Sequence, residues 1–210
     1  MNLLPPPMLA ATGRPGGPLE DWTVEAKLDG WRAIVGVRDG SVIVRTRRGR
    51  NVTDQLPELA QLSQLGVDIV LDGEIIAGGG RPAEFYELAG AMASRRRASP
   101  LNFVAFDLLA LDGVDLCSLP HDQRRRLLDH LAGLADGTVP VVPSHAGVDV
   151  DLVLAACEHL AMEGVVLKRR DATYRPGRRS TAWRKLRCDG FEQHRARSAI
   201  SATSLGAVTG

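Results

Sequence analysis

The stretch "VEAKLDGWRAIV", Val24–Val35, decides the fold. Two runs of apolar side chains flank Asp29-Gly30, which predicts two strands joined by a tight connection. Lys27 ends the first run, and Arg32 lies at the start of the second. A lysine at a strand end is often an ordinary solvated charge, so the rest of the chain has to decide between that interpretation and a chemical role.

Strands are predicted on both sides of this stretch. The run 67–77, "VDIVLDGEIIA", predicts a strand that either turns at Asp72-Gly73 or continues into another. The run 101–113 predicts a strand reaching Asp107 and a turn at Asp112-Gly113. The other predicted strands are 22–27, 32–38, 41–47, 163–170 and 183–187, with a hairpin turn at Asp39-Gly40.

Four segments have helical periodicity. Residues 56–65 follow a cap candidate at Thr53/Asp54, and residues 120–134 begin with a proline. The other two are 82–93, followed by a basic loop at 94–100, and 150–162. Residues 1 to about 20 are rich in Pro and Gly and predict an extended lead-in. This order of strands and helices predicts an α+β fold with mainly antiparallel sheets.

Composition restricts the class of protein. The chain has 210 residues, 44% of them hydrophobic, which is enough for one large domain with a real core. Its three cysteines are scattered and form no CxxC pair, which argues against a disulfide framework or a zinc site. The N-terminal stretch has no basic n-region and three prolines break its apolar run, so we expect no signal peptide, and no apolar stretch reaches the ~20 residues of a membrane span. We therefore expect a cytoplasmic protein with no membrane partner.

The charge is unevenly distributed. The formal net charge is only +1, but residues 163–197 contain eleven Lys or Arg against four Asp or Glu. Such an excess predicts that this part of the chain faces a polyanion. Aromatic residues make up only 4%, which does not favour a stacking platform for single-stranded nucleic acid.

Five short motifs each set a charged residue where a strand ends. One such residue alone is weak evidence, because strand-end carboxylates are usually turn formers. The motifs are "KLDGWR" at 27–32, "TRRG" at 46–49, "LDGEI" at 71–75, "FVAFDLL" at 103–109, and the pair "EGVVLK" at 163–168 with "WRKLR" at 183–187.

Together these motifs resemble the covalent nucleotidyltransferases: ATP-dependent DNA ligases, RNA ligases and mRNA capping enzymes. They follow the family's order of motifs I, III, IIIa, IV and V. The stretches "PPPMLA", "AFDLLALDG" and "YRPGRRSTAWRKLR" resemble bacterial DNA ligases of the end-joining type most. The resemblance implies an ATP-grasp-like nucleotidyltransferase domain of two antiparallel sheets flanked by helices.

The resemblance implies that Lys27 is the nucleophile. Its amine would attack the α-phosphate of ATP, form lysyl-AMP and release pyrophosphate. A free lysine is mostly protonated at neutral pH, so burial and neighbouring cations, including Mg²⁺, would have to activate it. A strand end suits this task, because the backbone stays fixed while the side chain reaches a phosphate.

The remaining roles are implied residue by residue. Glu25 would contact the adenine amino group, Glu74 the ribose hydroxyls, and Glu163 the Mg²⁺ ion. Phe106 would stack on the base, although simple core packing is an alternative. The residues that would contact ribose or phosphate are Arg32, Arg47, Lys168, Lys185 and Arg187. Two positions depart from the family: Thr46-Arg47-Arg48-Gly49 replaces Ser-Arg-Asn-Gly, and Arg187 stands where a second motif V lysine is common.

The resemblance also implies a division of the chain. We expect a lead-in at 1–20, an adenylation domain at 21–188 and a short tail at 189–210. The tail is too short for the OB-fold domain that carries motif VI in the family's ligases. This leads us to expect a truncated product, a fragment, or one half of a split enzyme.

Three functions remain open from the sequence. The first is a DNA ligase core that uses ATP and Mg²⁺ on nicked double-stranded DNA, with help from an OB-fold or end-joining partner in trans. The second is an RNA ligase or capping-type nucleotidyltransferase. The third is a remnant that binds nucleotide or DNA without turnover. The end-joining style of the motifs favours the first.

Overall fold

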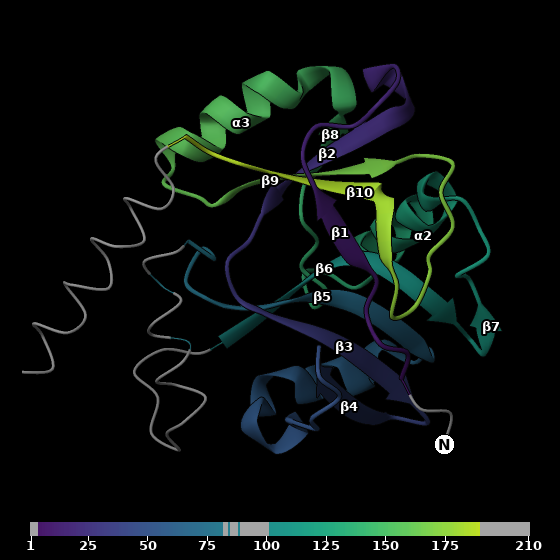
Figure 1. The fold of residues 1–210 in the computed structure, drawn as a ribbon. Helices are drawn as coiled ribbons and strands as arrows, with labels where there is room; N and C mark the ends of the chain where they lie inside the picture. Colours follow the sequence, from purple (N-terminus) through teal and green to yellow (C-terminus); the bar gives the residue numbers. More distant parts are fainter. Residues whose placement is uncertain (1–3, 82–83, 85–87, 89–100, 190–210) are drawn as a thin grey trace, which may run out of the picture.

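The structure is a computed structural model that describes residues 4–81, 84, 88 and 101–189. Its strands form two five-stranded sheets, which Figure 1 shows one above the other. The first sheet has the order β1-β10-β9-β2-β8, and the second has the order β4-β3-β5-β6-β7.

Seven of the ten described strands lie on predicted runs, whereas β1, β7 and β8 were not predicted. In the first sheet they are β1 Leu9–Thr12, β2 Trp22–Lys27, β8 Ser144–Ala146, β9 Gly164–Arg169 and β10 Arg179–Arg187. In the second sheet they are β3 Trp31–Arg38, β4 Ser41–Thr46, β5 Ile69–Ala77, β6 Leu101–Leu111 and β7 Val114–Asp115. The second sheet is antiparallel throughout, whereas β1 and β10 pair in parallel. The predicted α+β class is confirmed.

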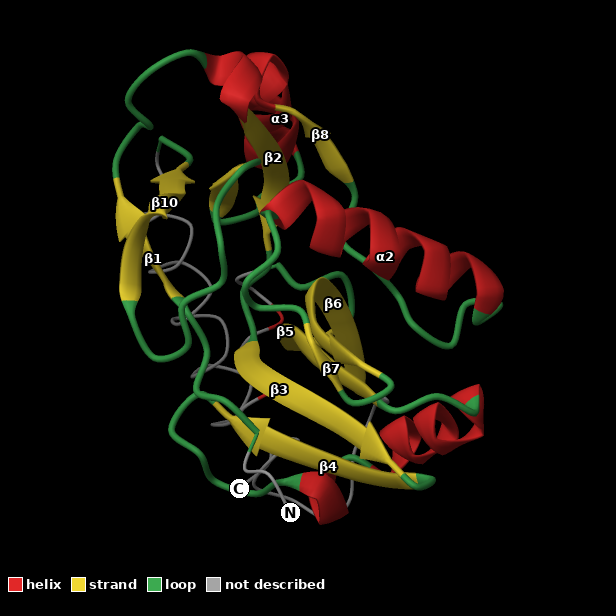
Figure 2. Cartoon of the chain, turned by 90° about the vertical axis from the view of Figure 1, so that its right-hand side faces the viewer, coloured by secondary structure: helices red, strands yellow, loops and turns green. Residues whose placement is uncertain are grey.

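Helices cover the outer faces of the sheets. Two α-helices have described bounds: α2, His121–Leu134, and α3, Val150–His159. α3 packs on the first sheet through Val150 and Cys157, which join Trp22, Val24 and Leu167 in one apolar cluster. Figure 2 shows α2 alongside β6, where Leu128 and Leu131 join the core of the second sheet. Short 3₁₀ helices complete the fold at Leu19–Asp21, Thr53–Gln55, Pro57–Leu65 and Gly147–Asp149.

Two Asp-Gly pairs form the turns predicted for them. Asp39 and Gly40 have φ values of 48° and 70°, and Asp112 and Gly113 have 46° and 79°. Two successive positive φ angles match the twist of a two-residue hairpin. Asp72-Gly73 behaves differently: β5 continues straight through it, while the register with β6 shifts at this point.

The segment 56–65 is helical but forms a 3₁₀ helix, and the predicted cap is wrong. Thr53 does not cap it, because its hydroxyl oxygen instead accepts a hydrogen bond from the backbone N–H of Val44 at 2.9 Å. Helix α3 ends at His159, earlier than predicted, since Ala161 takes a φ of 55° and the N–H of Met162 turns back to the carbonyl of Cys157.

The predicted lead-in contributes to the fold. Leu9–Thr12 form β1 and pair with β10, which therefore begins at Arg179 rather than at 183. Sequence periodicity could not reveal this pairing, because the partner lies about 170 residues away along the chain. Apart from Glu84 and Leu88, the helix predicted at 82–93 and the loop at 94–100 lie outside the described residues, as do tail residues 190–210. Within the described part, no helix has the length and apolarity needed to cross a bilayer.

Candidate active site

Strand alternation gathers the charged residues of the first sheet on one face. Lys27 lies opposite Gly164, and Glu25 opposite Val166, which in turn lies opposite Lys185. Residues directly opposite each other, and every second residue along a strand, share a face. The other face carries Val24, Val165 and Leu167, which pack against α3. The polar face is therefore turned toward the second sheet.

The second sheet supplies the opposite wall. Arg32 on β3 lies opposite Glu74 on β5, so both side chains share one face. Gly30, between β2 and β3, runs close to β5: a Cβ there would lie 2.2 Å from the carbonyl oxygen of Ile75. The Asp-Gly pair of the opening stretch is thus required for a close approach between backbones.

A cavity of about 1040 Å³ lies between these walls. Nine of the ten residues singled out from the sequence line it. Arg187 does not line the cavity. Its Nε lies 3.4 Å from Oε1 of Glu163, and Glu163 does line the cavity. The nine are Glu25, Lys27, Arg32, Arg47, Glu74, Phe106, Glu163, Lys168 and Lys185.

Lys27 is in direct contact with Glu163 through Nζ and Oε2. The Lys27 side chain is 22% exposed, and that of Glu163 only 6%. Gly164, next to Glu163, allows β9 to run close to β10: its φ is 148°, and a Cβ there would lie 2.0 Å from the carbonyl oxygen of Leu186. The amine is therefore accessible from the cavity while a buried carboxylate holds its position.

Cations surround this pair. Lys185 lines the same cavity, and burial, together with the nearby charges of Lys27 and Arg187, lowers its pKa. Arg47, Arg48 and Arg50 line the cavity from the exposed segment after β4. Such a concentration of positive charge around one amine favours a bound polyanion such as a triphosphate.

Glu25 and Lys168 form a second buried pair. Lys168 Nζ lies 2.6 Å from Oε2 of Glu25 and donates to the carbonyl of Phe106 at 2.8 Å. Burial raises the pKa of Glu25 and lowers that of Lys168, while each partner's charge opposes the shift of the other. The register of β6 with β5 shifts at Phe106, which accounts for a carbonyl that accepts from a side chain.

Phe106 both packs in the core and lines the cavity. It is 9% exposed and belongs to an apolar cluster with Ile34, Met8 and Trp183. The Arg32 guanidinium lies 4.4 Å from the centre of its ring, and Lys168 Nζ lies 4.5 Å from it. Core packing and contact with the cavity are therefore not exclusive alternatives for this residue.

Arg32 is held by residues that sequence reasoning missed. Its Nε and Nη2 each donate to a carboxylate oxygen of Asp72 at 2.5 Å. The Tyr174 hydroxyl donates to Asp72 at 2.6 Å and accepts from the backbone N–H of Met8 at 2.8 Å. Asp72 lies within the "LDGEI" motif, but nothing in the sequence indicates that Tyr174, 102 residues away, reaches it.

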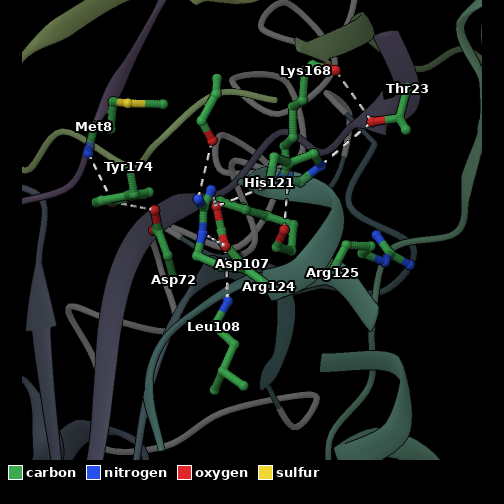
Figure 3. A network of polar contacts seen from close by, with 12 residues as sticks. Met8, Thr23, Asp72, Asp107, Leu108, His121, Arg124, Arg125, Lys168 and Tyr174 are labelled. Atoms are coloured by element: carbon green, nitrogen blue, oxygen red, sulfur yellow. Dashed lines mark hydrogen bonds and ion pairs between the residues drawn. The ribbon is translucent and has the colours of Figure 1, made fainter. Parts of the chain in front are cut away.

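Figure 3 shows a second missed group beside the first, around Asp107 and Arg124. Arg124 on α2 donates to both oxygens of Asp107 at 2.8 Å, and both side chains are fully buried. His121 packs against them, and burial lowers its pKa to about 3, so this histidine is neutral. This group anchors α2 to β6 below the cavity.

The described residues contain no cluster of three or more His, Cys, Asp or Glu that could by itself hold a metal ion. Glu163 alone offers a carboxylate beside Lys27. One carboxylate is a suitable donor set for Mg²⁺, which usually keeps its waters and binds substrate phosphates as further ligands.

Comparison with known proteins identifies the family. The sequence profile described as "ATP dependent DNA ligase domain" matches residues 7–187, so the chain belongs to this family of catalytic domains. Among curated proteins, it is 38% identical over 184 residues to the multifunctional non-homologous end joining protein LigD of Mycobacterium bovis. It is 39% identical over 198 residues to a probable DNA ligase of Streptomyces avermitilis.

Solved structures agree with this assignment. The ligase domain of Mycobacterium tuberculosis LigD matches with a TM-score of 0.75 and 34% identity over 87% of this chain. A mycobacterial DNA ligase D solved with ATP matches with a TM-score of 0.74. The chain spans 23% of the length of the M. bovis relative, 38% of the Streptomyces relative and 60% of each solved chain.

Proposed function

We propose that this domain forms a covalent lysyl-AMP on Lys27 and passes the AMP to the 5′-phosphate of nicked DNA. The single observation that carries the proposal is the position of Lys27: at a fixed strand end, inside the cavity, between Glu163 and Lys185. Support comes from the ATP bound to the similar mycobacterial ligase D.

The first step is a phosphoryl transfer. The neutral Lys27 amine attacks the α-phosphorus of ATP, a N–P bond forms, the bond to the β-phosphate oxygen breaks, and pyrophosphate leaves with one proton released from nitrogen. Lys185 and Arg47 bind the phosphates and offset the charge that develops on them. Glu74 and Arg32 hold the ribose, and Glu25 and Phe106 enclose the base. Lys168, expected from the resemblance to contact phosphate, is held in this structure by Glu25 and the carbonyl of Phe106.

Mg²⁺ would be held by Glu163 together with phosphate oxygens and water. It supplies charge neutralisation at the reacting phosphate. A cation bound at Glu163 would draw this carboxylate away from Lys27 and so favour the neutral, nucleophilic amine. Arg187 Nε lies 3.4 Å from Oε1 of the same carboxylate and would help to hold it.

In the second stage, a 5′-phosphate oxygen attacks the α-phosphorus of lysyl-AMP and the N–P bond breaks, which regenerates Lys27. Attack by the 3′-hydroxyl then releases AMP and joins the strand. The exposed arginines of "RPGRR" and "TRRG" would bind backbone phosphates, which makes binding sequence-independent and salt-sensitive. An OB-fold or end-joining protein supplied in trans is the expected helper for this stage.

Self-adenylation tests the first stage. The purified chain is incubated with α-labelled ATP and Mg²⁺, beside Lys27→Ala and Lys27→Arg, and acid-labile covalent label is measured. Lys27→Arg keeps a cation beside Glu163 and removes the nucleophile, so it separates loss of chemistry from loss of structure. Label in the wild type and none in either variant is the expected result.

Two alternatives remain as outcomes of the same assay. Label from α-labelled GTP equal to that from ATP would favour a capping-type enzyme. No label from either nucleotide, with ATP still bound, would favour a binding remnant. Joining of a nicked duplex, measured for the chain alone and with an added OB-fold domain, tests the second stage and the need for a partner.

A further inference from the structure

Along β2, the residues that form the cavity wall around Glu25 differ from the cations that surround Lys27. Glu25 lies two residues from Lys27, roughly 7 Å along the strand. Its register partners are Val166 on β9 and Ser144 on β8. Val142, just before β8, also lines the cavity. If the phosphates of a nucleotide lie near Lys27, its base therefore faces Glu25, Val142 and Val166.

Arg125 holds two parts of this wall at once. Its Nη1 donates to Oε1 of Glu25 at 3.0 Å, and its Nη2 donates to the carbonyl of Val142 at 2.7 Å. Its Nε donates to Asp129 at 2.9 Å, one turn along α2. The Arg125 side chain is only 11% exposed. Figure 3 shows Arg125 on the same helix as Arg124, projecting to a different side.

These contacts restrict what Glu25 offers to a base. Its side chain is 3% exposed, and its two oxygens are bound separately: Oε1 by Arg125 and Oε2 by Lys168. An ionised carboxylate can only accept hydrogen bonds. Adenine presents an amino donor at the position where guanine presents a carbonyl acceptor, so an acceptor-only wall attracts the first and repels the second.

We propose that Arg125, outside all five motifs, is a positioning residue that selects adenine over guanine nucleotides by fixing the Glu25 carboxylate and the Val142 carbonyl through one planar fork. This inference rests on the nucleotide site proposed above. Lysine is a point donor and cannot reproduce both contacts, so the geometry requires arginine.

The charges facing Glu25 explain why Lys168 alone is not sufficient to keep the Glu25 carboxyl ionised. Burial raises the pKa of Glu25, Lys168 on β9 and Arg125 on α2 lower it, and Asp107 on β6 raises it again. Without Arg125 the carboxyl would keep its proton to a higher pH. A protonated carboxyl is a donor and can bond to the guanine carbonyl.

The test compares nucleotide affinity in the wild type, Arg125→Gln, Arg125→Lys and a matched control, Arg126→Gln. Arg126 is the exposed neighbour on the same helix. Dissociation constants for ATP and for GTP are measured by calorimetry without Mg²⁺, at about pH 6.5 and about pH 8.5. Covalent labelling by α-labelled ATP is measured in parallel with Mg²⁺.

The wild type and Arg126→Gln are expected to prefer ATP equally at both pH values. In Arg125→Gln the preference is expected to fall about tenfold, and by less at the higher pH, because a higher pH favours the ionised, acceptor-only carboxylate of Glu25. Arg125→Lys falls by a smaller factor. Equal weakening of ATP and GTP in Arg125→Gln, with no pH effect, would show a merely structural role and overturn the proposal.

Arg125→Lys keeps the proposal testable if Arg125→Gln does not fold. If Arg125→Lys prefers ATP over GTP as strongly as the wild type does, the guanidinium fork has no special role and the proposal is overturned. A wild type that binds ATP and GTP equally would also overturn it. A wild type that prefers ATP but takes no label defeats only the adenylation proposal. A labelled wild type with an unchanged preference in Arg125→Gln defeats only the role of Arg125.

Discussion

Lys27 and Glu163, 136 residues apart in the chain, are in direct contact within the cavity. The register of β2 with β9 sets this contact, because Lys27 lies opposite Gly164, the neighbour of Glu163. The proposed nucleophile and the proposed metal ligand are therefore coupled before any substrate binds. A cation bound at Glu163 would therefore compete with Lys27 for this carboxylate.

Glu163→Gln is expected to weaken the response to Mg²⁺. The amide keeps the size of the side chain but lacks the charge that binds the ion and holds Lys27. Half-maximal labelling should require about 10- to 100-fold more Mg²⁺, the usual cost of disturbing a metal ligand's surroundings. Glu158→Gln, on the exposed side of α3, is the control. An unchanged Mg²⁺ requirement would exclude Glu163 as the ligand.

Glu74 predicts a pH-dependent step in ATP binding. Burial raises its pKa from 4.5 to about 7, against the opposing charges of Arg32 and Lys27. Ionised Glu74 accepts ribose hydroxyl hydrogens, so affinity for ATP should increase as pH rises through about 7. Calorimetry across this range should show the step in the wild type and not in Glu74→Gln. A step of the same size in the variant would assign it to another group.

The same residue affects stability with the opposite sign. Because the folded protein favours neutral Glu74, its contribution is complete below pH 4.5 and is lost as pH rises through about 7. Thermal unfolding followed between these values should show a decline in the wild type that is smaller in Glu74→Gln. Equal declines would contradict a buried, neutral Glu74.

Asp107→Asn is expected to destabilise the domain severely. It leaves Arg124 buried beside a neutral amide, and breaking such a pair typically costs about 3–5 kcal/mol. Despite the opposing effect of burial, the hydrogen bonds and charge of Arg124 lower the pKa of Asp107. Its contribution is thus present above the unfolded-state pKa of about 4 and lost as pH falls further.

Urea unfolding at neutral and acidic pH measures both effects of Asp107→Asn. Exposed Asp54→Asn is the matched control and should stay within about 0.5 kcal/mol of the wild type. A small loss in Asp107→Asn, or an unchanged acid limb, would show that the pair with Arg124 does not determine stability.

Tyr174→Phe should cost about 1–3 kcal/mol of unfolding free energy, because it leaves the Met8 N–H and an Asp72 oxygen without their buried partner. Denaturant titration measures the loss. Removal of the exposed Arg14–Asp151 pair by Arg14→Ala should cost much less. Equal losses in the two variants would mean that water replaces the tyrosine hydroxyl.

The local pattern of the sequence was sufficient for most elements, and the family resemblance singled out residues that line the cavity. Period-two alternation in "WTVEAK" and "WRKLR" already places Lys27 with Glu25, and Lys185 with Trp183, on common faces. These relations depend only on neighbouring residues, which is why they can be read without a structure. The motif residues do line one cavity; their individual roles stay predictions.

Only the tertiary structure decided which contacts form between segments that are distant in the chain. The pairing of β1 with β10 and the contacts of Tyr174 and Arg125 depend on partners far along the chain. No periodicity encodes such partners, since each is set by packing and by the need to satisfy buried charges. The sequence alone singled out residues that line the cavity, because motifs are local, and the folded chain determined which other residues hold them there, because those partners are brought together only by packing.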